Sequence, residues 1–125
     1  ESMLEPARTV SIFQKTPDPL FFSTGDVIFE IGQTGTVMYG VIEGSVNLVV
    51  NGKVVETIQV GDVFGEGALV HPSKVRASTA IAQTDCTLAC LDERRFLFAI
   101  QTTPMFAVEI MRSFSERLRR LKQQF

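Results

Sequence analysis

The sequence contains one histidine, His71, and two cysteines, Cys86 and Cys90, among its 125 residues. A zinc or non-haem iron site built on imidazole needs two or three histidines, and an iron–sulfur cluster needs four thiolates, so this chain supplies neither alone. The cysteines belong to a strand-like run in which they would stand about 13 Å apart, too far for a disulfide. We therefore expect free, buried thiols in a reducing compartment, the cytoplasm, and neither a metal site nor a resident cofactor.

The chain also lacks an excess of charge and a long apolar segment. There are 12 Lys and Arg against 14 Asp and Glu, for a net charge of −2, whereas a free-standing nucleic-acid-binding module is usually basic. No apolar run approaches the ~20 residues of a membrane span, and residues 1–10 are unlike a secretory signal peptide. The pattern predicts a single domain, residues 1–125, that neither crosses a membrane nor binds a nucleic-acid polymer by itself.

All nine glycines lie between Gly25 and Gly67, with short β-branched and aromatic runs between them. Short strands separated by turn residues indicate a β-sandwich or barrel, here over residues 20–91. The clearest turn signal is Asn51-Gly52, which favours a two-residue hairpin because both positions need positive φ. A second strand pair is expected at 77–82 and 86–91, joined through 83–85.

Helices are predicted at both ends of this β region, at about 4–14, 93–101 and 104–124. The last helix carries a stripe of apolar side chains at helical spacing: Phe106, Ile110, Phe114, Leu118, Leu121 and Phe125. Its basic residues complement the negative end of the helix dipole. Because the stripe is still running at Phe125, we expect it to contact a partner or a further segment.

The segment 61–80 combines glycines with two isolated charges. Phe64-Gly65-Glu66 leaves a strand and enters what is predicted to be a short helical turn, and Arg76 follows Glu66 by ten residues, where the next strand is expected. Glycines let backbone N–H groups approach a ligand, and a helix N-terminus favours an anion. A buried arginine needs an anionic partner. From the residue types alone, that partner is either a bound anion or Glu66 itself.

The arrangement of these residues resembles the cyclic nucleotide-binding domain, the module of the catabolite activator protein, cAMP-dependent protein kinase regulatory subunits and cyclic-nucleotide-gated channels. The resemblance covers roughly residues 12–125 and implies an eight-stranded β-roll, similar to a jelly roll, with one N-terminal and two C-terminal helices. The matching positions are Gly25-Asp26-Val27-Ile28-Phe29, Gly32, Gly35, Met38-Tyr39, Glu43-Gly44, Gly61-Asp62, Phe64-Gly65-Glu66, Ala68-Leu69 and Arg76-Ala77.

The resemblance also implies a regulatory cyclic nucleotide site and a role for its residues. Arg76 would hold the exocyclic phosphate oxygens with its planar fork, and Glu66 would accept a hydrogen bond from the ribose 2′-hydroxyl. Leu118 or Leu121 would cover the base, although plain helix packing explains both equally well. The implied phosphate-binding cassette comprises Phe64, Gly65, Glu66, Gly67, Ala68, Leu69, Arg76, Ala77 and Ser78.

Ligand choice and competing functions depend on few residues. Ala77 stands where cGMP-selective members carry threonine, which favours cAMP over cGMP, although Ser78 and Thr79 also carry hydroxyls. His71 is expected to be an exposed loop residue rather than a catalytic base. One alternative is a ligand-free β-roll that forms a homodimer or binds an effector domain through its C-terminal helices. A β-roll enzyme is a further alternative, disfavoured by the single histidine.

Overall fold

The computed structural model describes residues 5–15 and 18–125, so the predicted start of the first helix at residue 4 lies outside the described residues. Within these residues the helices are α1 (Pro6–Phe13), α2 (Gly67–Val70), α3 (Glu93–Thr102) and α4 (Met105–Lys122). The strands are β1 (Leu20–Phe22), β2 (Val27–Phe29), β3 (Val37–Glu43), β4 (Val46–Val50), β5 (Lys53–Ile58), β6 (Val63–Phe64), β7 (Thr79–Ala82) and β8 (Cys86–Asp92).

The eight strands form two antiparallel four-stranded sheets, ordered β1-β8-β3-β6 and β2-β7-β4-β5. This confirms the predicted β-roll with an N-terminal helix and two C-terminal helices. Asn51 and Gly52 have φ of 52° and 76° and connect the paired strands β4 and β5. The Asn-Gly hairpin is therefore confirmed, because this left-handed backbone is open to glycine and tolerated by asparagine.

One predicted strand pairing is wrong. β7 pairs with β2 and β4, whereas β8 pairs with β1 and β3. The connection at 83–85 carries the chain from one sheet to the other instead of turning a hairpin. Its hydrogen bonds go to the β3–β4 turn, where Gln83 N donates to Ser45 O at 3.0 Å and Ser45 N donates to Thr84 Oγ1 at 3.1 Å. The β3–β4 and β7–β8 connections therefore lie next to each other, and each carries the chain from one sheet to the other.

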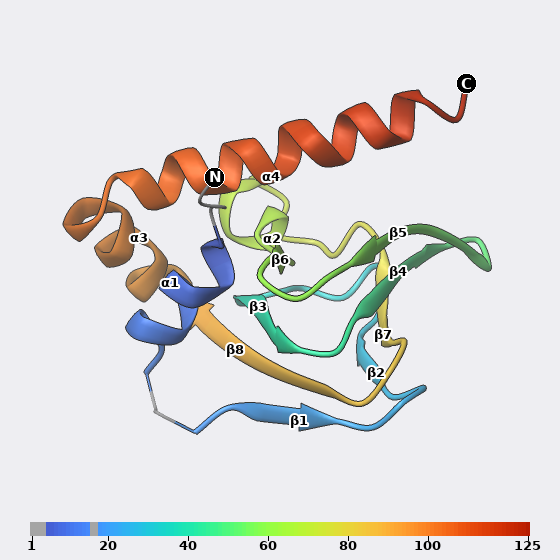
Figure 1. The fold of residues 1–125 in the computed structure, drawn as a ribbon, viewed down its shortest axis with the longest axis horizontal. Helices are drawn as coiled ribbons and strands as arrows, with labels where there is room; N and C mark the ends of the chain where they lie inside the picture. Colours follow the sequence, from blue (N-terminus) through green and yellow to red (C-terminus); the bar gives the residue numbers. More distant parts are fainter. Residues whose placement is uncertain (1–4, 16–17) are drawn as a thin grey trace.

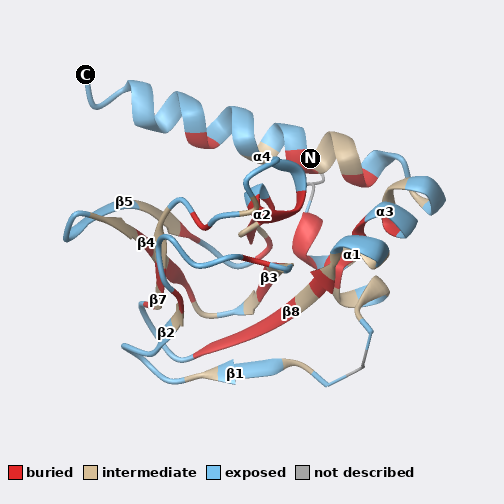
Figure 2. Ribbon diagram, turned by 180° about the vertical axis from the view of Figure 1, so that it is seen from behind, coloured by how far each residue is buried: buried red, intermediate tan, exposed pale blue. Residues whose placement is uncertain are grey.

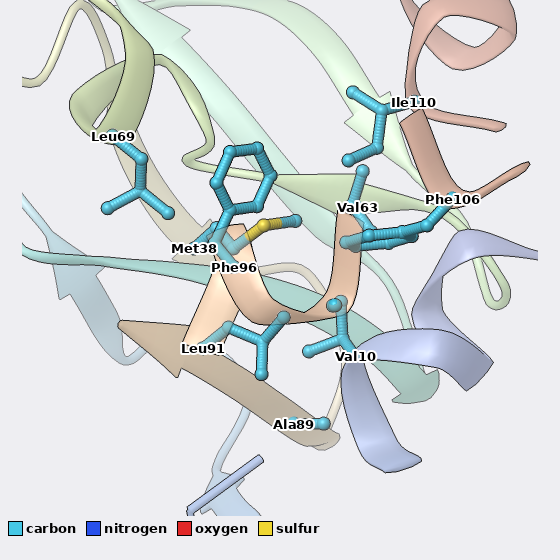
Figure 3. Close-up of a cluster of buried hydrophobic side chains, with 10 residues drawn as sticks. Val10, Met38, Val63, Leu69, Ala89, Leu91, Phe96, Phe106 and Ile110 are labelled. Atoms are coloured by element: carbon cyan, nitrogen blue, oxygen red, sulfur yellow. The ribbon is translucent and has the colours of Figure 1, made fainter. Parts of the chain in front are cut away.

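Alternating side chains of β3 and β8 supply two separate cores. Val41 and Leu88 face the space between the sheets, and Met38 and Leu91 face the helices. Figure 3 shows this helix-side cluster, in which Val10 of α1, Phe96 of α3 and Phe106 of α4 converge. β8 is buried along most of its length because both of its faces are covered (Figure 2).

The C-terminal helices are set against one end of the β-roll. Asp92 caps α3 by accepting a hydrogen bond from Arg95 N at 2.8 Å, as a helix N-cap does. α4 then runs along the β-roll, with α1 and α3 beside its N-terminal half and its C-terminal half extending past α2 toward β5 (Figure 1). This course brings α4 over the segment that follows β6.

Cys86 and Cys90 are free thiols, as the strand spacing predicted. Cys86 is buried and Cys90 is half-buried. Burial raises the pKa of both thiols, which keeps them protonated and weakly nucleophilic.

Candidate functional site

The segment that follows β6 folds around two backbone features. Gly65 has φ of 80° and turns the chain out of β6, after which α2 forms a single helical turn over Gly67–Val70. Leu69 N donates to Glu66 O at 2.9 Å. The predicted strand–turn–helix order is therefore present. Arg76, however, precedes β7 by three residues and lies in a loop rather than at the strand start.

Arg76 is buried beneath this turn, with 5% of its surface exposed. Its Nη1 donates to Gly65 O at 2.8 Å and its Nη2 to Val37 O at 2.7 Å. The guanidinium carbon lies 4.0 Å from the centre of the Phe29 ring. Burial lowers the pKa of Arg76, yet an arginine stays charged at neutral pH.

An internal Glu66–Arg76 ion pair, one of the two partners left open by the sequence, is not formed. The ion pairs within the described residues include none to Arg76. Its close partners are carbonyl dipoles and an aromatic face, which satisfy N–H groups without supplying a full negative charge.

Gly35 provides the space that Arg76 occupies. A Cβ atom at Gly35 would lie 2.5 Å from Arg76 Cζ and 2.6 Å from Ala68 Cβ. No real Cβ makes such contacts, so the guanidinium would have to leave its position. The glycine therefore permits a close approach of three chain segments.

Glu66 is buried as well, at 4% exposure. Its Oε1 has no hydrogen-bond partner among the described residues, and its Oε2 lies 3.8 Å from Arg117 Nη2. Burial raises the pKa of Glu66 despite the opposing effect of Arg117. A buried carboxylate oxygen without a donor is costly and suits an incoming hydroxyl or amine.

Arg117 of α4 closes the site from the helix side. Its Nε donates to Glu56 Oε1 at 2.7 Å, and its Nη1 donates to Val63 O at 3.0 Å and to Ser113 Oγ at 3.2 Å. Burial acts to lower the pKa of Arg117, but the carboxylates of Glu66 and Glu56 outweigh it and the pKa is raised. Arg117 thus joins α4 to β5, β6 and the 64–78 segment.

These residues border a cavity of about 480 Å³, a volume typical of small-molecule sites. Seven residues predicted from the sequence line it: Gly65, Glu66, Gly67, Ala68, Arg76, Ala77 and Ser78. Phe64 and Leu69 instead pack into the two cores. The lining residues that sequence reasoning did not select are Phe29, Leu48, Glu56, His71, Ser73, Val75, Phe114 and Arg117.

The two candidate base-covering leucines do not reach the cavity. Leu118 is 52% exposed and Leu121 is 39% exposed, and α4 contributes Phe114 and Arg117 in their place. With about 3.6 residues per turn, eleven residues are close to three turns. Arg117 therefore lies on the same buried helix face as Phe106, whereas Leu118 lies about 120° around the helix from Phe106.

Signals for the missed residues were available in the sequence. The series Phe106, Ile110, Ser113 and Arg117 keeps one helix face, but the polar members hide it from an apolar pattern. Glu56 shares its strand face with buried Ile58 because side chains alternate along β5. His71 is exposed as predicted, yet it also lines the cavity.

Within residues 5–15 and 18–125, no group of three or more His, Cys, Asp and Glu side chains is placed to bind a metal ion. Over the same described residues, no helix combines the length and the apolar character required to span a bilayer.

Comparison with known proteins identifies the family of the chain. The sequence profile of the cyclic nucleotide-binding domain matches residues 19–103, well over half of the chain. The cAMP-dependent protein kinase regulatory subunit of Schizosaccharomyces pombe is 36% identical over 105 residues, which cover 77% of this chain but 25% of that subunit's length.

Solved structures share the fold. Thermus thermophilus catabolite activator protein superposes with a TM-score of 0.74 at 24% identity, covering 96% of this chain and 57% of that one. PfPKA-R with cAMP bound superposes with a TM-score of 0.72 at 24% identity, covering 97% of this chain and 44% of that one. With the profile match and the cavity at its characteristic segment, the chain belongs to the cyclic nucleotide-binding domain family.

Proposed function

We propose that the chain binds a cyclic nucleotide in the 480 Å³ cavity, cAMP in preference to cGMP, and acts as a regulatory module rather than as an enzyme. The observation that carries the proposal is the buried Arg76 guanidinium. It has no carboxylate partner among the described residues, and its two carbonyl contacts use two of its five N–H groups. The remaining N–H groups and the charge suit two oxygens of a phosphate.

Glu66 supports a ribose beside that phosphate. Glu66 lines the cavity, and its Oε1 has no hydrogen-bond partner among the described residues, so this carboxylate suits a hydrogen bond from a 2′-hydroxyl. A hydrogen bond to a charged group contributes about 1.5–3 kcal/mol. A 2′-deoxy ligand leaves this buried oxygen unsatisfied and therefore binds more weakly.

The preference for cAMP rests on the rest of the lining. Ala77 borders the cavity with a methyl group where a threonine hydroxyl would favour guanine, and Leu48 and Phe114 add apolar surface for a purine. The proposal needs no metal or prosthetic group.

Coupling to α4 forms the regulatory part of the proposal. Glu66 belongs to the ligand site and lies 3.8 Å from Arg117 Nη2. A ligand that engages Glu66 changes the electrostatic partner of Arg117, and with it the balance between positions of α4. Such a ligand shifts a population only by its different affinity for the two positions.

Titration calorimetry with cAMP and cGMP tests the binding proposal. We expect cAMP to bind more tightly than cGMP, and Arg76→Ala to weaken cAMP binding at least tenfold, which corresponds to about 1.4 kcal/mol. Arg112→Ala, which removes an exposed arginine of α4, serves as the control and should leave affinity unchanged. The absence of heat at millimolar nucleotide would instead favour the ligand-free interaction module.

We propose in addition that α4 contacts a second copy of the chain. Exposed apolar residues of α4 follow a three-four-three spacing, the pattern of a two-helix interface: Met111, Phe114, Leu118 and Leu121. Sedimentation equilibrium should show a concentration-dependent dimer that Leu118→Glu abolishes. A monomer at every concentration would leave an effector domain as the partner of this face.

A further inference from the structure

We propose that Lys74 is a positioning residue that couples the nucleotide cavity to α3. The inference rests on the proposed function and concerns a route to the C-terminal helices separate from the contact of Arg117 with Glu66. The backbone of Lys74 points to it. With φ of 59°, Lys74 is one of two non-glycine residues with positive φ among those described, the other being Asn51 in the hairpin turn. A left-handed backbone is unfavourable for lysine, so the side chain at this position calls for a functional reason.

Lys74 lies in a chain segment that borders two cavities. Its neighbours Ser73 and Val75 line the nucleotide cavity. Lys74 itself lines a second cavity of about 550 Å³, which Leu69 of α2 and Leu97 of α3 also border. The segment therefore presents Ser73 and Val75 to the ligand and Lys74 to the space between α2 and α3.

The ammonium group of Lys74 joins elements on both sides of the second cavity. Its Nζ donates to Leu69 O at 3.4 Å and to Glu93 Oε1 at 3.5 Å, and Glu93 is the first residue of α3. The side chains of Lys74 and Glu93 keep 41% and 55% of their surface exposed. Because water can solvate both charges, this ion pair can break and form again at little cost, as a contact that responds to a ligand must.

Backbone hydrogen bonds connect Lys74 to Arg76, which is proposed to bind the phosphate. Lys74 O accepts from Gly35 N at 2.8 Å, and Arg76 N donates to Gln33 O at 2.8 Å. Residues 74–76 are thus held as one short segment against residues 33–35. A phosphate that engages Arg76 acts on the same segment that carries Lys74, and through Lys74 on Glu93. By linkage, a contact that differs between the free and the bound state changes the affinity for the ligand.

Two replacements of Lys74 separate its charge from its backbone. Lys74→Asn removes the ammonium group, and asparagine tolerates the left-handed conformation. We expect this variant to bind cAMP about two- to fivefold more weakly, the effect that an exposed ion pair supports, because the pair stabilises the arrangement that places Arg76 at the cavity. Lys74→Arg keeps a cation within reach of Glu93 and should retain the wild-type affinity.

The experiment is calorimetric titration of cAMP into wild type, Lys74→Asn, Lys74→Arg, Glu93→Gln and the double variant Lys74→Asn/Glu93→Gln. If the two residues act as a pair, the double variant should lose no more affinity than either single variant. Arg94→Gln is the control, since Arg94 also lines the second cavity from α3 but forms no ion pair among the described residues. Hydrogen exchange of residues 93–102 provides the second readout: cAMP should slow it in wild type and in Arg94→Gln, and slow it less in Lys74→Asn.

Four results would overturn the inference. Binding of cAMP to Lys74→Asn and Glu93→Gln with wild-type affinity would contradict it while leaving the proposed function intact. Losses that add in the double variant would show that the two residues act independently. An equal exchange response of α3 in wild type and Lys74→Asn would show that α3 is reached by another route. Binding of neither cAMP nor cGMP to wild type would contradict the proposed function and this inference together.

Discussion

Arg76 and Arg117 are buried beside the same cavity, at 5% and 9% exposure, yet their guanidinium groups meet different partners. Arg76 donates to two backbone carbonyls and lies over the Phe29 ring. Arg117 contacts the carboxylates of Glu56 and Glu66. The charge of Arg76 is therefore not balanced by a carboxylate, whereas the charge of Arg117 is.

In the proposed function, this contrast separates a cation that binds the ligand from one that holds the structure together. Carbonyl dipoles satisfy hydrogen-bond donors but do not cancel a charge, so a buried arginine of this kind is completed by an anion. The pKa of Arg76 is lowered by burial, whereas the pKa of Arg117 is raised because its carboxylates outweigh burial. The same residue type therefore meets two different sets of partners at one cavity.

Replacement of Arg117 should have the largest effect on stability. Arg117→Met leaves Glu66 and the partly buried Glu56 without their cation, and breaking a buried ion pair from one side costs about 3 kcal/mol of unfolding free energy. Urea denaturation followed by circular dichroism measures the loss. Arg120→Met, on the exposed side of the same helix, should change little.

A triple variant sharpens this prediction. Combining Arg117→Met with Glu56→Gln and Glu66→Gln removes the unpaired charges and should recover most of the lost stability, because neutral replacement of a buried ion network is often tolerated. If the Arg117→Met single variant unfolded with the same free energy as wild type, the structural role of Arg117 would be contradicted.

Replacement of Arg76 should cost less stability than replacement of Arg117. Arg76→Ala leaves Val37 O and Gly65 O without their donors, and the opened space admits water, so we expect a loss of about 1–2 kcal/mol. The same denaturation series measures it without nucleotide. A loss as large as that of Arg117→Met would indicate a carboxylate partner for Arg76 and would remove the contrast between the two arginines.

The smallest expected effect is the pH dependence from Glu66. Its folded pKa is raised above the ordinary value of 4.5 by burial, so the folded state favours the protonated acid. The stabilising contribution is complete below pH 4.5 and is lost as pH rises through the folded pKa. Glu66→Gln should therefore gain stability relative to wild type between pH 4.5 and neutral pH.

Thermal unfolding of both proteins across this range tests the sign. Cyclic nucleotide binding provides the second measurement, since Glu66→Gln should weaken it while the unliganded protein is not destabilised at neutral pH. If Glu66→Gln became less stable than wild type as the pH rises, the contact of Glu66 with Arg117 would outweigh the cost of burying the Glu66 carboxylate.

The β-roll was predictable because its signals are local. Asn51-Gly52 fixes one hairpin through backbone sterics, and the N-cap residue Asp92 marks where α3 begins. The exchange of sheets at 83–85 was not predictable in this way. A three-residue connection fits a hairpin equally well, and its direction is decided by hydrogen bonds to Ser45, which is remote in the sequence.

The candidate site divides in the same manner. Residues 65–68 and 76–78 are close in sequence and form a pattern that identified them. Glu56 and Arg117 are separated from that pattern and from each other in the sequence, and neither was selected because a polar residue does not stand out in an apolar pattern. Their inward orientation follows from strand and helix periodicity only when the buried neighbours are known.

The sequence by itself determined the fold family, the turn positions and the isolated cation Arg76, because these depend on backbone conformation and on residues near one another in the chain. Only the tertiary structure decided that Glu66 faces Arg117 instead of Arg76 and that α4 presents Phe114 rather than Leu118 to the cavity. The physical reason is that the energy of a buried charge depends on which groups surround it, and those groups are assembled from distant parts of the chain.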